Sequence, residues 1–184
     1  MIVGLTGFCC SGKDTIAIYL TEKYGYEHYS LSDVIREMMV RISVEPSREN
    51  MISWGNQLRK NEGNGILARK VLENNRLSSN CCITSIRHPD EVIELKKSNF
   101  ILVNVDATRH IRFSRMRSRN RAGDPSTIEK FVEFEERELQ IDGHGQQLMR
   151  TINMADITFV NNFSSISLLK VSVDGLVKNL KSRY

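Results

Sequence analysis

The sequence lacks long apolar runs and low-complexity segments, and its 184 residues include only three prolines. No self-similarity at a fixed period is visible, which excludes a repeat architecture. The first residues, MIVGLTG, lack a basic leader and reach a glycine at once, so they predict neither a signal peptide nor a membrane span. We therefore expect a cytoplasmic protein that has no membrane partner.

Cysteine spacing also excludes two classes of site. The four cysteines form two adjacent pairs, Cys9-Cys10 and Cys81-Cys82, and this spacing fits neither a CxxC zinc site nor a disulfide framework. We expect reduced thiols packed beside strands, with a redox-sensitive thiol pair at Cys9-Cys10 as the alternative.

Acidic residues are missing from one strongly basic segment, although the net charge of the chain is only +4. The segment RHIRFSRMRSRNR begins at Arg109 and ends at Arg121. Such a run fits either a nucleic-acid patch or a clamp for phosphate groups. Few aromatic residues lie near it for unpaired bases to stack on, so nucleic acid is the less favoured partner.

The length and the 40% hydrophobic content allow one sizeable core, so we expect a single domain over residues 1–184. Apolar runs that predict buried strands occur at residues 2–5, 80–86, 100–106 and 157–161, and a further short strand is predicted at residues 27–30. Segments with helical spacing separate them. Strands that alternate with helices imply a parallel sheet covered on both faces. We predict an α/β fold, a three-layer sandwich around a five-stranded parallel sheet.

The predicted helices have recognisable ends. Ser32 or Asp33 can cap a helix over residues 31–42, and Ser47 with Asn50 can start another that ends at Gly63. Further helices are predicted over the five segments 66–75, 89–97, 126–139, 146–152 and 164–180, and one more runs through the arginine-rich segment.

The clearest motif follows the first strand. Residues 7–13, GFCCSGK, match the GxxxxGK part of the Walker A motif and stand between a predicted strand and a predicted helix, as that motif requires. The glycines let backbone N–H groups face a phosphate, the helix N-terminus adds a positive dipole end, and Lys13 adds a mobile charge. We expect the nucleotide phosphates to be surrounded by Gly7, Cys10, Ser11, Gly12, Lys13, Asp14 and Thr15.

Asp14 stands where the strict motif has Ser or Thr, and Thr15 follows it. We expect the Asp14 side chain to point outward, because a carboxylate repels phosphates. The GKxT spacing resembles the nucleoside monophosphate kinases, in which the residue after the lysine varies and the next Thr meets the phosphate. The resemblance implies ATP as donor and assigns that role, together with contact to Mg²⁺, to Thr15.

Two further motifs extend the resemblance to acceptor binding. Residues 30–36, SLSDVIR, resemble the loop and helix of adenylate-kinase-like enzymes whose arginine grips the acceptor phosphate, here Arg36. Residues 84–87, TSIR, resemble their DGxR element, so Arg87 becomes a second grip. A cation suits this task because the acceptor's anionic group must be held and neutralised before attack. The alternative for Arg36 is a solvated helix arginine.

The family carboxylate that holds magnesium through water falls on Thr84. Asp33 and Asp106 are the candidates to supply the missing charge, and Asp33 is also a possible base. Only Asp106 follows four apolar residues at a strand end, which equally suits a cap of the next helix.

The resemblance also implies a short lid over about residues 115–140, with acceptor-binding helices over about residues 31–76. Arg115 and Arg119 occupy the RxxxR positions that lead into such a lid, and Arg137 falls near its return arm. Arginines that close from a lid stabilise the moving phosphoryl group and exclude water. Asn161 falls on the segment beside the adenine, so contact with the base edge is implied.

The motifs span residues 2 to about 162, and their order is also similar to dephospho-CoA kinase and to a mainly archaeal group regarded as nucleotide kinases. The resemblance implies a P-loop kinase fold and an ATP-dependent phosphotransferase acting on a phosphate-bearing small molecule, as monomer or homodimer. The alternative is a P-loop switch or RNA-associated ATPase that binds nucleic acid through the arginine-rich segment.

Overall fold

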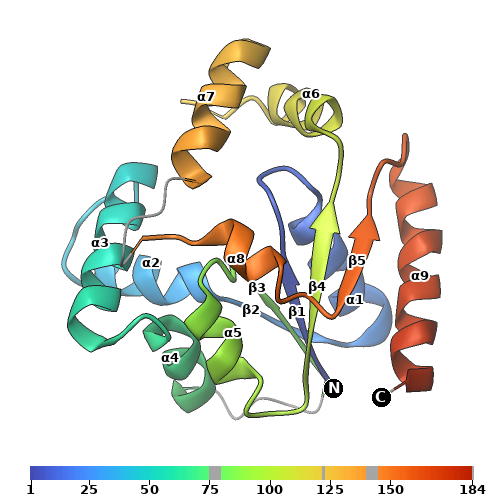
Figure 1. Ribbon diagram of the computed structural model, residues 1–184, viewed down its shortest axis with the longest axis horizontal. Helices are drawn as coiled ribbons and strands as arrows, with labels where there is room; N and C mark the ends of the chain where they lie inside the picture. Colours follow the sequence, from blue (N-terminus) through green and yellow to red (C-terminus); the bar gives the residue numbers. More distant parts are fainter. Residues whose placement is uncertain (75–79, 122, 140–144, 184) are drawn as a thin grey trace.

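The computed structural model describes residues 1–74, 80–121, 123–139 and 145–183 (Figure 1). Its sheet has five parallel strands in the order β2-β3-β1-β4-β5. The strands are β1 Ile2–Thr6, β2 Glu27–Ser30, β3 Cys81–Thr84, β4 Phe100–Asp106 and β5 Ile157–Val160. The central position of β1 places the carboxyl ends of β3 and β4 on either side of the segment that follows it. A loop after β1 therefore meets both neighbouring strand ends.

Helices cover both faces of the sheet (Figure 1). The helices of the described residues are α1 Lys13–Tyr24, α2 Leu31–Arg41, α3 Arg48–Glu62, α4 Ile66–Asn74, α5 Pro89–Leu95, α6 Arg109–Arg119, α7 Ile128–Leu139, α8 Leu148–Ile152 and α9 Ile166–Arg183. One core lies under α1 and α9 and includes Ile16 and Val173. The other lies under α2, α4 and α5 and includes Leu31 and Val92. The predicted three layers are confirmed.

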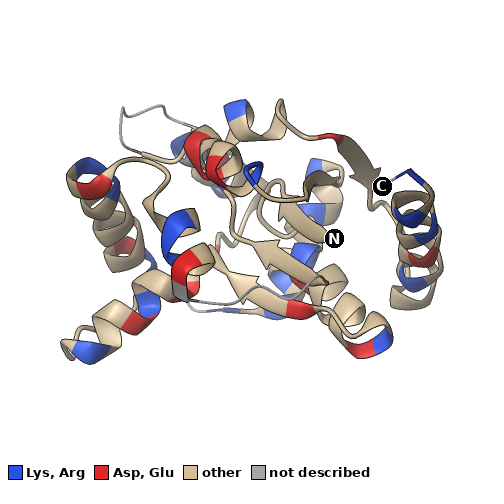
Figure 2. Cartoon of the chain, turned by 90° about the horizontal axis from the view of Figure 1, so that it is seen from below, with Lys and Arg blue, Asp and Glu red and all other residues tan. Residues whose placement is uncertain are grey.

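Charge is distributed as this layering requires. Figure 2 shows lysine, arginine, aspartate and glutamate on the helices and loops, while the strands are almost entirely uncharged. In the five described strands the only charged residues are Glu27, the first residue of β2, and Asp106, the last residue of β4. Within the described residues, no helix combines the length and apolar character that crossing a membrane needs.

Several predicted ends shift in the structure. Helix α2 begins at Leu31 directly after β2, with Ser30 as N-cap and no side-chain cap, so the predicted cap by Ser32 or Asp33 is wrong. Strand β3 ends at Thr84 because Ser85 has a φ of 62°, which leaves extended geometry. The start of α3 is confirmed, since the Ser47 side chain accepts a hydrogen bond from Asn50 N–H.

The other helix ends differ by a few residues. Helices α7 and α8 each begin two residues later than predicted, α5 ends at Leu95, and α9 continues to Arg183. Residue 75 of the predicted fourth helix and residues 122 and 140 of the predicted lid lie outside the described part of the chain.

Helices α6 and α7 lie beyond the carboxyl edge of the sheet (Figure 1). Glu135 of α7 joins them, since its carboxylate pairs with Arg109, at 3.0 Å, and with Arg112. Arg112 is 5% exposed and its guanidinium lies 4.6 Å from the centre of the Phe8 ring. The α6–α7 pair is therefore anchored to the loop that follows β1.

Candidate functional site

The loop after β1 has the backbone that its glycines predict. Gly7, Cys10 and Gly12 have φ of 129°, 59° and 106°, in or near the left-handed region that favours glycine. A Cβ on Gly7 would lie 2.2 Å from the Val105 carbonyl oxygen of β4, so no larger residue fits there. Gly12 is the N-cap of α1, which begins at Lys13. Loop and helix N-terminus together form an anion-binding cradle.

Lys13 folds back over this loop. Its Nζ donates to the carbonyl oxygens of Gly7 and Phe8, both at 2.7 Å, and lies 3.5 Å from Ser11 Oγ. The ammonium group therefore stands at the mouth of the cradle rather than in the core. Asp14 is exposed and Thr15 is half-buried, and both line the cavity at this loop, so the outward orientation of the Asp14 side chain stays a prediction.

Arg115 and Asn161 hold the phosphate loop through hydrogen bonds to the Ser11 carbonyl oxygen. Asn161 is 1% exposed and its Nδ2 donates to the Ser11 carbonyl oxygen at 2.7 Å. Arg115 Nη1 donates to the same oxygen at 3.2 Å, and its Nη2 donates to the Asn161 carbonyl oxygen at 3.0 Å. Burial lowers the pKa of Arg115 below its ordinary value. These contacts make Asn161 a brace of the loop, and its contact with a base stays a prediction.

The cysteines are all free thiols, as expected. Cys81 and Cys82 are buried in β3, and the Cys9 and Cys10 sulfurs lie 3.8 Å apart in the loop. The hydrogen bond with Cys9, followed by burial, raises the pKa of Cys10 well above its usual range. A protonated thiol is a poor nucleophile, which argues against a reactive thiolate at Cys10.

Arg119 is held by the loop between α6 and α7. Its Nε and Nη2 each lie 2.8 Å from an Asp124 carboxylate oxygen, a bidentate pair. The pair raises the pKa of Arg119 and lowers that of Asp124. Arg119 Nη2 also lies 3.9 Å from Cys9 Sγ, so this arginine reaches the phosphate loop.

The ends of β2 and β3 carry hydroxyls rather than carboxylates. Thr84 is 2% exposed and its Oγ1 lies 2.9 Å from His28 Nε2. Ser30 Oγ lies 2.8 Å from the hydroxyls of both Ser32 and Ser85. Within the described residues, no group of three or more His, Cys, Asp or Glu side chains could hold a metal ion.

Two cavities open at this edge of the sheet. The first, of about 590 Å³, is lined by the phosphate loop and includes Lys13, Asp14 and Thr15. The second, of about 690 Å³, lies toward α2 and α3 and includes Ser32 and Arg36. Both are lined by the same five residues: Arg48, Ser85, Arg87, Arg119 and Arg121. The cavities therefore meet along a wall of arginines.

Most of the predicted site residues meet around these cavities. The first is also lined by Cys10, Gly12, Arg115 and Asn161, and Arg87 lies on the shared wall, where its Nη1 donates to Gln146 Oε1 at 2.8 Å. Arg36 forms an ion pair with Asp33 on the same helix, and both side chains are about half exposed.

Five predicted residues line neither cavity: Gly7 and Ser11 of the phosphate loop, and Asp33, Asp106 and Arg137. The Asp106 carboxylate accepts a hydrogen bond from Ala107 N–H at 2.9 Å. The N-cap of α6 is Thr108, after Ala107, so this bond does not cap the helix, and the predicted capping alternative is wrong. Arg137 is exposed on α7. Their functional roles stay predictions.

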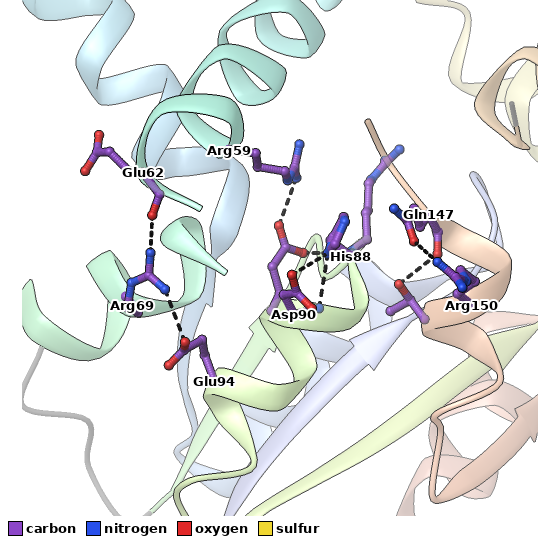
Figure 3. Close-up of polar contacts among 11 residues, drawn as sticks. Arg59, Glu62, Arg69, His88, Asp90, Glu94, Gln147 and Arg150 are labelled. Carbon is purple, nitrogen blue, oxygen red and sulfur yellow. Dashed lines mark hydrogen bonds and ion pairs between the residues drawn. The ribbon is translucent and has the colours of Figure 1, made fainter. Parts of the chain in front are cut away.

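Sequence reasoning missed three residues near the cavities: Arg48, Arg59 and Glu91. Arg48 lies at the start of α3 with its guanidinium 4.2 Å from the centre of the Phe134 ring, and it lines both cavities. Arg59 and Glu91 form a buried ion pair beside the second cavity (Figure 3). The hydrophobic spacing of α3 is the only hint, since it places Arg59 on the buried face with Gly55 and Leu58.

A phosphate-binding loop between a central parallel strand and its following helix defines a P-loop protein. The sequence pattern of the AAA domain family (AAA_18) matches residues 3–145. A UPF0200 protein of Thermococcus kodakarensis is 34% identical over 172 residues, 89% of this chain and 90% of that one. A UPF0200 protein of Hyperthermus butylicus is 31% identical over 169 residues, 89% and 87% of the two chains. The chain therefore belongs to the AAA domain family and to the UPF0200 proteins.

Solved structures share its architecture. Shikimate kinase from Bacteroides thetaiotaomicron has a TM-score of 0.62 at 15% identity and covers 98% of both chains. Shikimate kinase from Aquifex aeolicus has a TM-score of 0.59 at 16% identity, over 99% of this chain and 97% of that chain. At such identities the likeness shows the fold alone. The predicted P-loop kinase fold is confirmed.

Proposed function

We propose that the protein is an ATP-dependent phosphotransferase that transfers the γ-phosphoryl group to a nucleotide or nucleotide-like acceptor, such as a (deoxy)nucleoside monophosphate or dephospho-CoA. The observation that carries the proposal is the pair of cavities that meet along a shared arginine wall. Two anionic substrates need neighbouring sites and a cationic boundary, because phosphoryl transfer is catalysed mainly by positioning and charge stabilisation.

The cavity at the phosphate loop is the donor site in this proposal. The loop N–H groups and the N-terminus of α1 hold the β- and γ-phosphates, and Lys13 exchanges its carbonyl partners for phosphate oxygens. Arg115 and Asn161 keep the Ser11 carbonyl turned away from the phosphates by occupying it as donors. The loop is thus already shaped for an anion before the donor binds.

The second cavity is the acceptor site. Arg87 lies on the shared wall and Arg36 on the wall toward α2, so the two can hold an acceptor phosphate at the boundary. Asp33 is engaged with Arg36, which supports a role in orienting that arginine. A base is required only if the acceptor atom is a hydroxyl, because a phosphate acceptor is already anionic.

Arg119 is the residue placed to stabilise the moving phosphoryl group. It lines both cavities and reaches Cys9 of the phosphate loop. Its partner Asp124 holds it by two hydrogen bonds, and exchange of that carboxylate for phosphoryl oxygens brings its charge to the reacting group. Arg137 would have to move toward the cavities on lid closure to contribute.

Thr15 is the residue that fits Mg²⁺ best, since its half-buried side chain lines the donor cavity. Mg²⁺ keeps several waters and is bound through few protein ligands plus substrate phosphates, which agrees with the small set of oxygen ligands here. Bound with the triphosphate, the ion would neutralise charge on the β- and γ-phosphates. The contacts of Asp106 give no support for its part in holding the ion.

The switch or RNA-associated ATPase is less well supported. Three of the five arginines of α6 are engaged inside the protein: Arg112 pairs with Glu135, Arg115 braces the phosphate loop, and Arg119 pairs with Asp124. Arg109 and Arg117 are exposed, so only part of this basic helix is open to nucleic acid.

The direct test is a screen for phosphoryl transfer from radiolabelled ATP. The acceptors are AMP, GMP, CMP, UMP, their deoxy forms and dephospho-CoA, with shikimate included because the structural neighbours are shikimate kinases. We expect transfer to a phosphate-bearing acceptor and a strong loss of acceptor use in Arg87→Ala. Hydrolysis that no acceptor changes, and that RNA stimulates, would instead support the ATPase.

A further inference from the structure

Arg59 of α3 and Glu91 of α5 form an ion pair that is almost completely shielded from solvent. Arg59 Nη2 lies 2.8 Å from Glu91 Oε1, and the two side chains are 4% and 0% exposed (Figure 3). The other carboxylate oxygen, Oε2, accepts hydrogen bonds from the N–H groups of Arg87, at 2.8 Å, and His88, at 3.0 Å. Glu91 therefore fixes both Arg59 and the backbone that carries Arg87.

The hydrogen bonding of Arg59 is incomplete. Its Nε is buried and has no partner, and the pair with Glu91 is its sole polar contact within the described residues. A buried donor without a partner destabilises the protein unless a ligand supplies the missing acceptor. A guanidinium has five N–H donors in a fixed fork that matches the oxygens of phosphate and carboxylate groups.

This incomplete guanidinium is part of the wall of the acceptor cavity. Gly55, one turn earlier on α3, leaves it room, since a Cβ there would lie 3.3 Å from Arg59 Nη1. The charged residues of this cavity wall are mainly arginines, namely Arg36, Arg48, Arg59, Arg87, Arg119 and Arg121, against Glu49 and Asp124. That balance favours an acceptor with more than one negative charge.

A second pair shows what a purely structural contact looks like here. Arg69 Nη1 of α4 lies 3.1 Å from Glu94 Oε1 of α5, so this pair also ties a neighbouring helix to α5 (Figure 3). Arg69 also donates to the Glu62 carbonyl oxygen, its side chain is 35% exposed, and it lines neither substrate cavity. Tying helices to α5 thus does not require burial of an arginine beside a cavity.

We propose that Arg59 binds an oxyanion group of the acceptor, and that Glu91 is a positioning residue for Arg59 and for Arg87. The proposal rests on the proposed function in one respect, the assignment of the second cavity to the acceptor. The oxyanion belongs either to a phosphate or to a carboxylate. The test separates these sources with AMP, which carries a phosphate, and shikimate, which carries a carboxylate and no phosphate.

The test is a calorimetric titration of AMP and of shikimate into protein saturated with a non-hydrolysable ATP analogue and Mg²⁺. The parent is compared with Arg59→Lys, which keeps the charge opposite Glu91, and with Arg69→Lys as the matched control. We expect the ligand that binds the parent to bind Arg59→Lys at least tenfold more weakly. Arg69→Lys should match the parent within about twofold, and affinity for the ATP analogue should be unchanged in both.

Equal acceptor affinity in the parent and Arg59→Lys would overturn the proposal, and so would a parent that binds neither ligand. If Arg59→Lys does not fold, the double variant Arg59→Met/Glu91→Gln removes both charges together and replaces it in the titration. Failure of the proposed function gives a different result. A parent that binds AMP but never transfers phosphate refutes the kinase activity and leaves the role of Arg59 standing.

Discussion

At the scale of single residues, Lys13 is the most direct probe of the donor site. Its ammonium group donates hydrogen bonds to the carbonyl oxygens of Gly7 and Phe8 in the phosphate loop. Lys13→Ala should lower ATP-dependent transfer on the order of 10²-fold or more, because a cation at the transferred group is lost. The unfolding free energy should change by about 1 kcal/mol or less.

The measurement for Lys13→Ala is initial transfer rate together with urea unfolding, and Lys178→Ala on the exposed surface of α9 is the control. A parental rate in Lys13→Ala would show that the cradle does not bind the donor phosphates. A large loss of stability would show that the lysine supports the loop itself.

Thr84 tests how the metal is held. It occupies the end of β3, at the position where the sequence resemblance to nucleoside monophosphate kinases implies a carboxylate, and its hydroxyl lies 2.9 Å from His28 Nε2. Thr84→Asp should lower the Mg²⁺ concentration for half-maximal transfer, since hard cations and their waters prefer carboxylate oxygens. Thr84→Asn has the same shape without the charge and should leave the Mg²⁺ dependence of transfer as in the parent.

Asp106→Asn extends the same magnesium titration. The Asp106 carboxylate accepts a hydrogen bond from Ala107 N–H and lines neither cavity. The Mg²⁺ dependence of transfer in this variant should therefore follow that of the parent. A shift for Asp106→Asn, with none for Thr84→Asp, would place the metal on the β4 side of the loop instead.

At the scale of elements, the strands were the easiest part to predict. The run at residues 100–106 is apolar except for Asn104 and the final Asp106, and the observed β4 has the same bounds. Helix starts were harder, since α2 follows β2 with no intervening loop and needs no side-chain cap. Local pattern identifies buried strands well because both faces of a parallel sheet are covered.

The α6–α7 pair depends on a contact that local pattern does not reveal. Arg109 and Arg112 look like members of a basic surface in the sequence, yet both pair with Glu135 of α7, and burial lowers the pKa of Arg112. The partners are more than twenty residues apart in the chain. Only tertiary structure shows which of several arginines in a run is buried.

Glu135→Ala tests this anchoring of α6 to α7. Removing one partner of a buried ion pair leaves Arg112 uncompensated and should lower the unfolding free energy by about 3–5 kcal/mol. Affinity for ATP should also fall, because Arg112 packs on Phe8 of the phosphate loop. Urea unfolding and nucleotide titration measure the two effects, and Glu133→Ala, exposed on the same helix, should change stability by about 0.5 kcal/mol or less. Equal stability of the two variants would contradict the anchoring.

At the scale of the whole molecule, strand order and the shared arginine wall could not be predicted from the sequence. The motifs identified the phosphate loop, Arg36 and Arg87, since each lies at a strand end or helix start with a distinctive local pattern. Arg48 and Arg59 both come from α3, and they reach the cavity walls only because that helix packs against α2 and α4. Their contribution depends on long-range packing, which residue spacing does not encode.

The meeting of the two cavities leads to the last prediction. A compound that joins two adenosines through a pentaphosphate should fill both cavities at once and place its phosphate chain along the arginine wall. Linking two ligands makes the second binding event intramolecular, so affinity rises without new contacts. Ligands that bind only the folded state raise the unfolding temperature according to their affinity. The linked compound should therefore raise it more than equal concentrations of an ATP analogue and AMP added together, and Arg87→Ala should lose most of the difference. If the linked compound stabilises the protein no more than the ATP analogue alone, the second cavity does not accept a nucleotide.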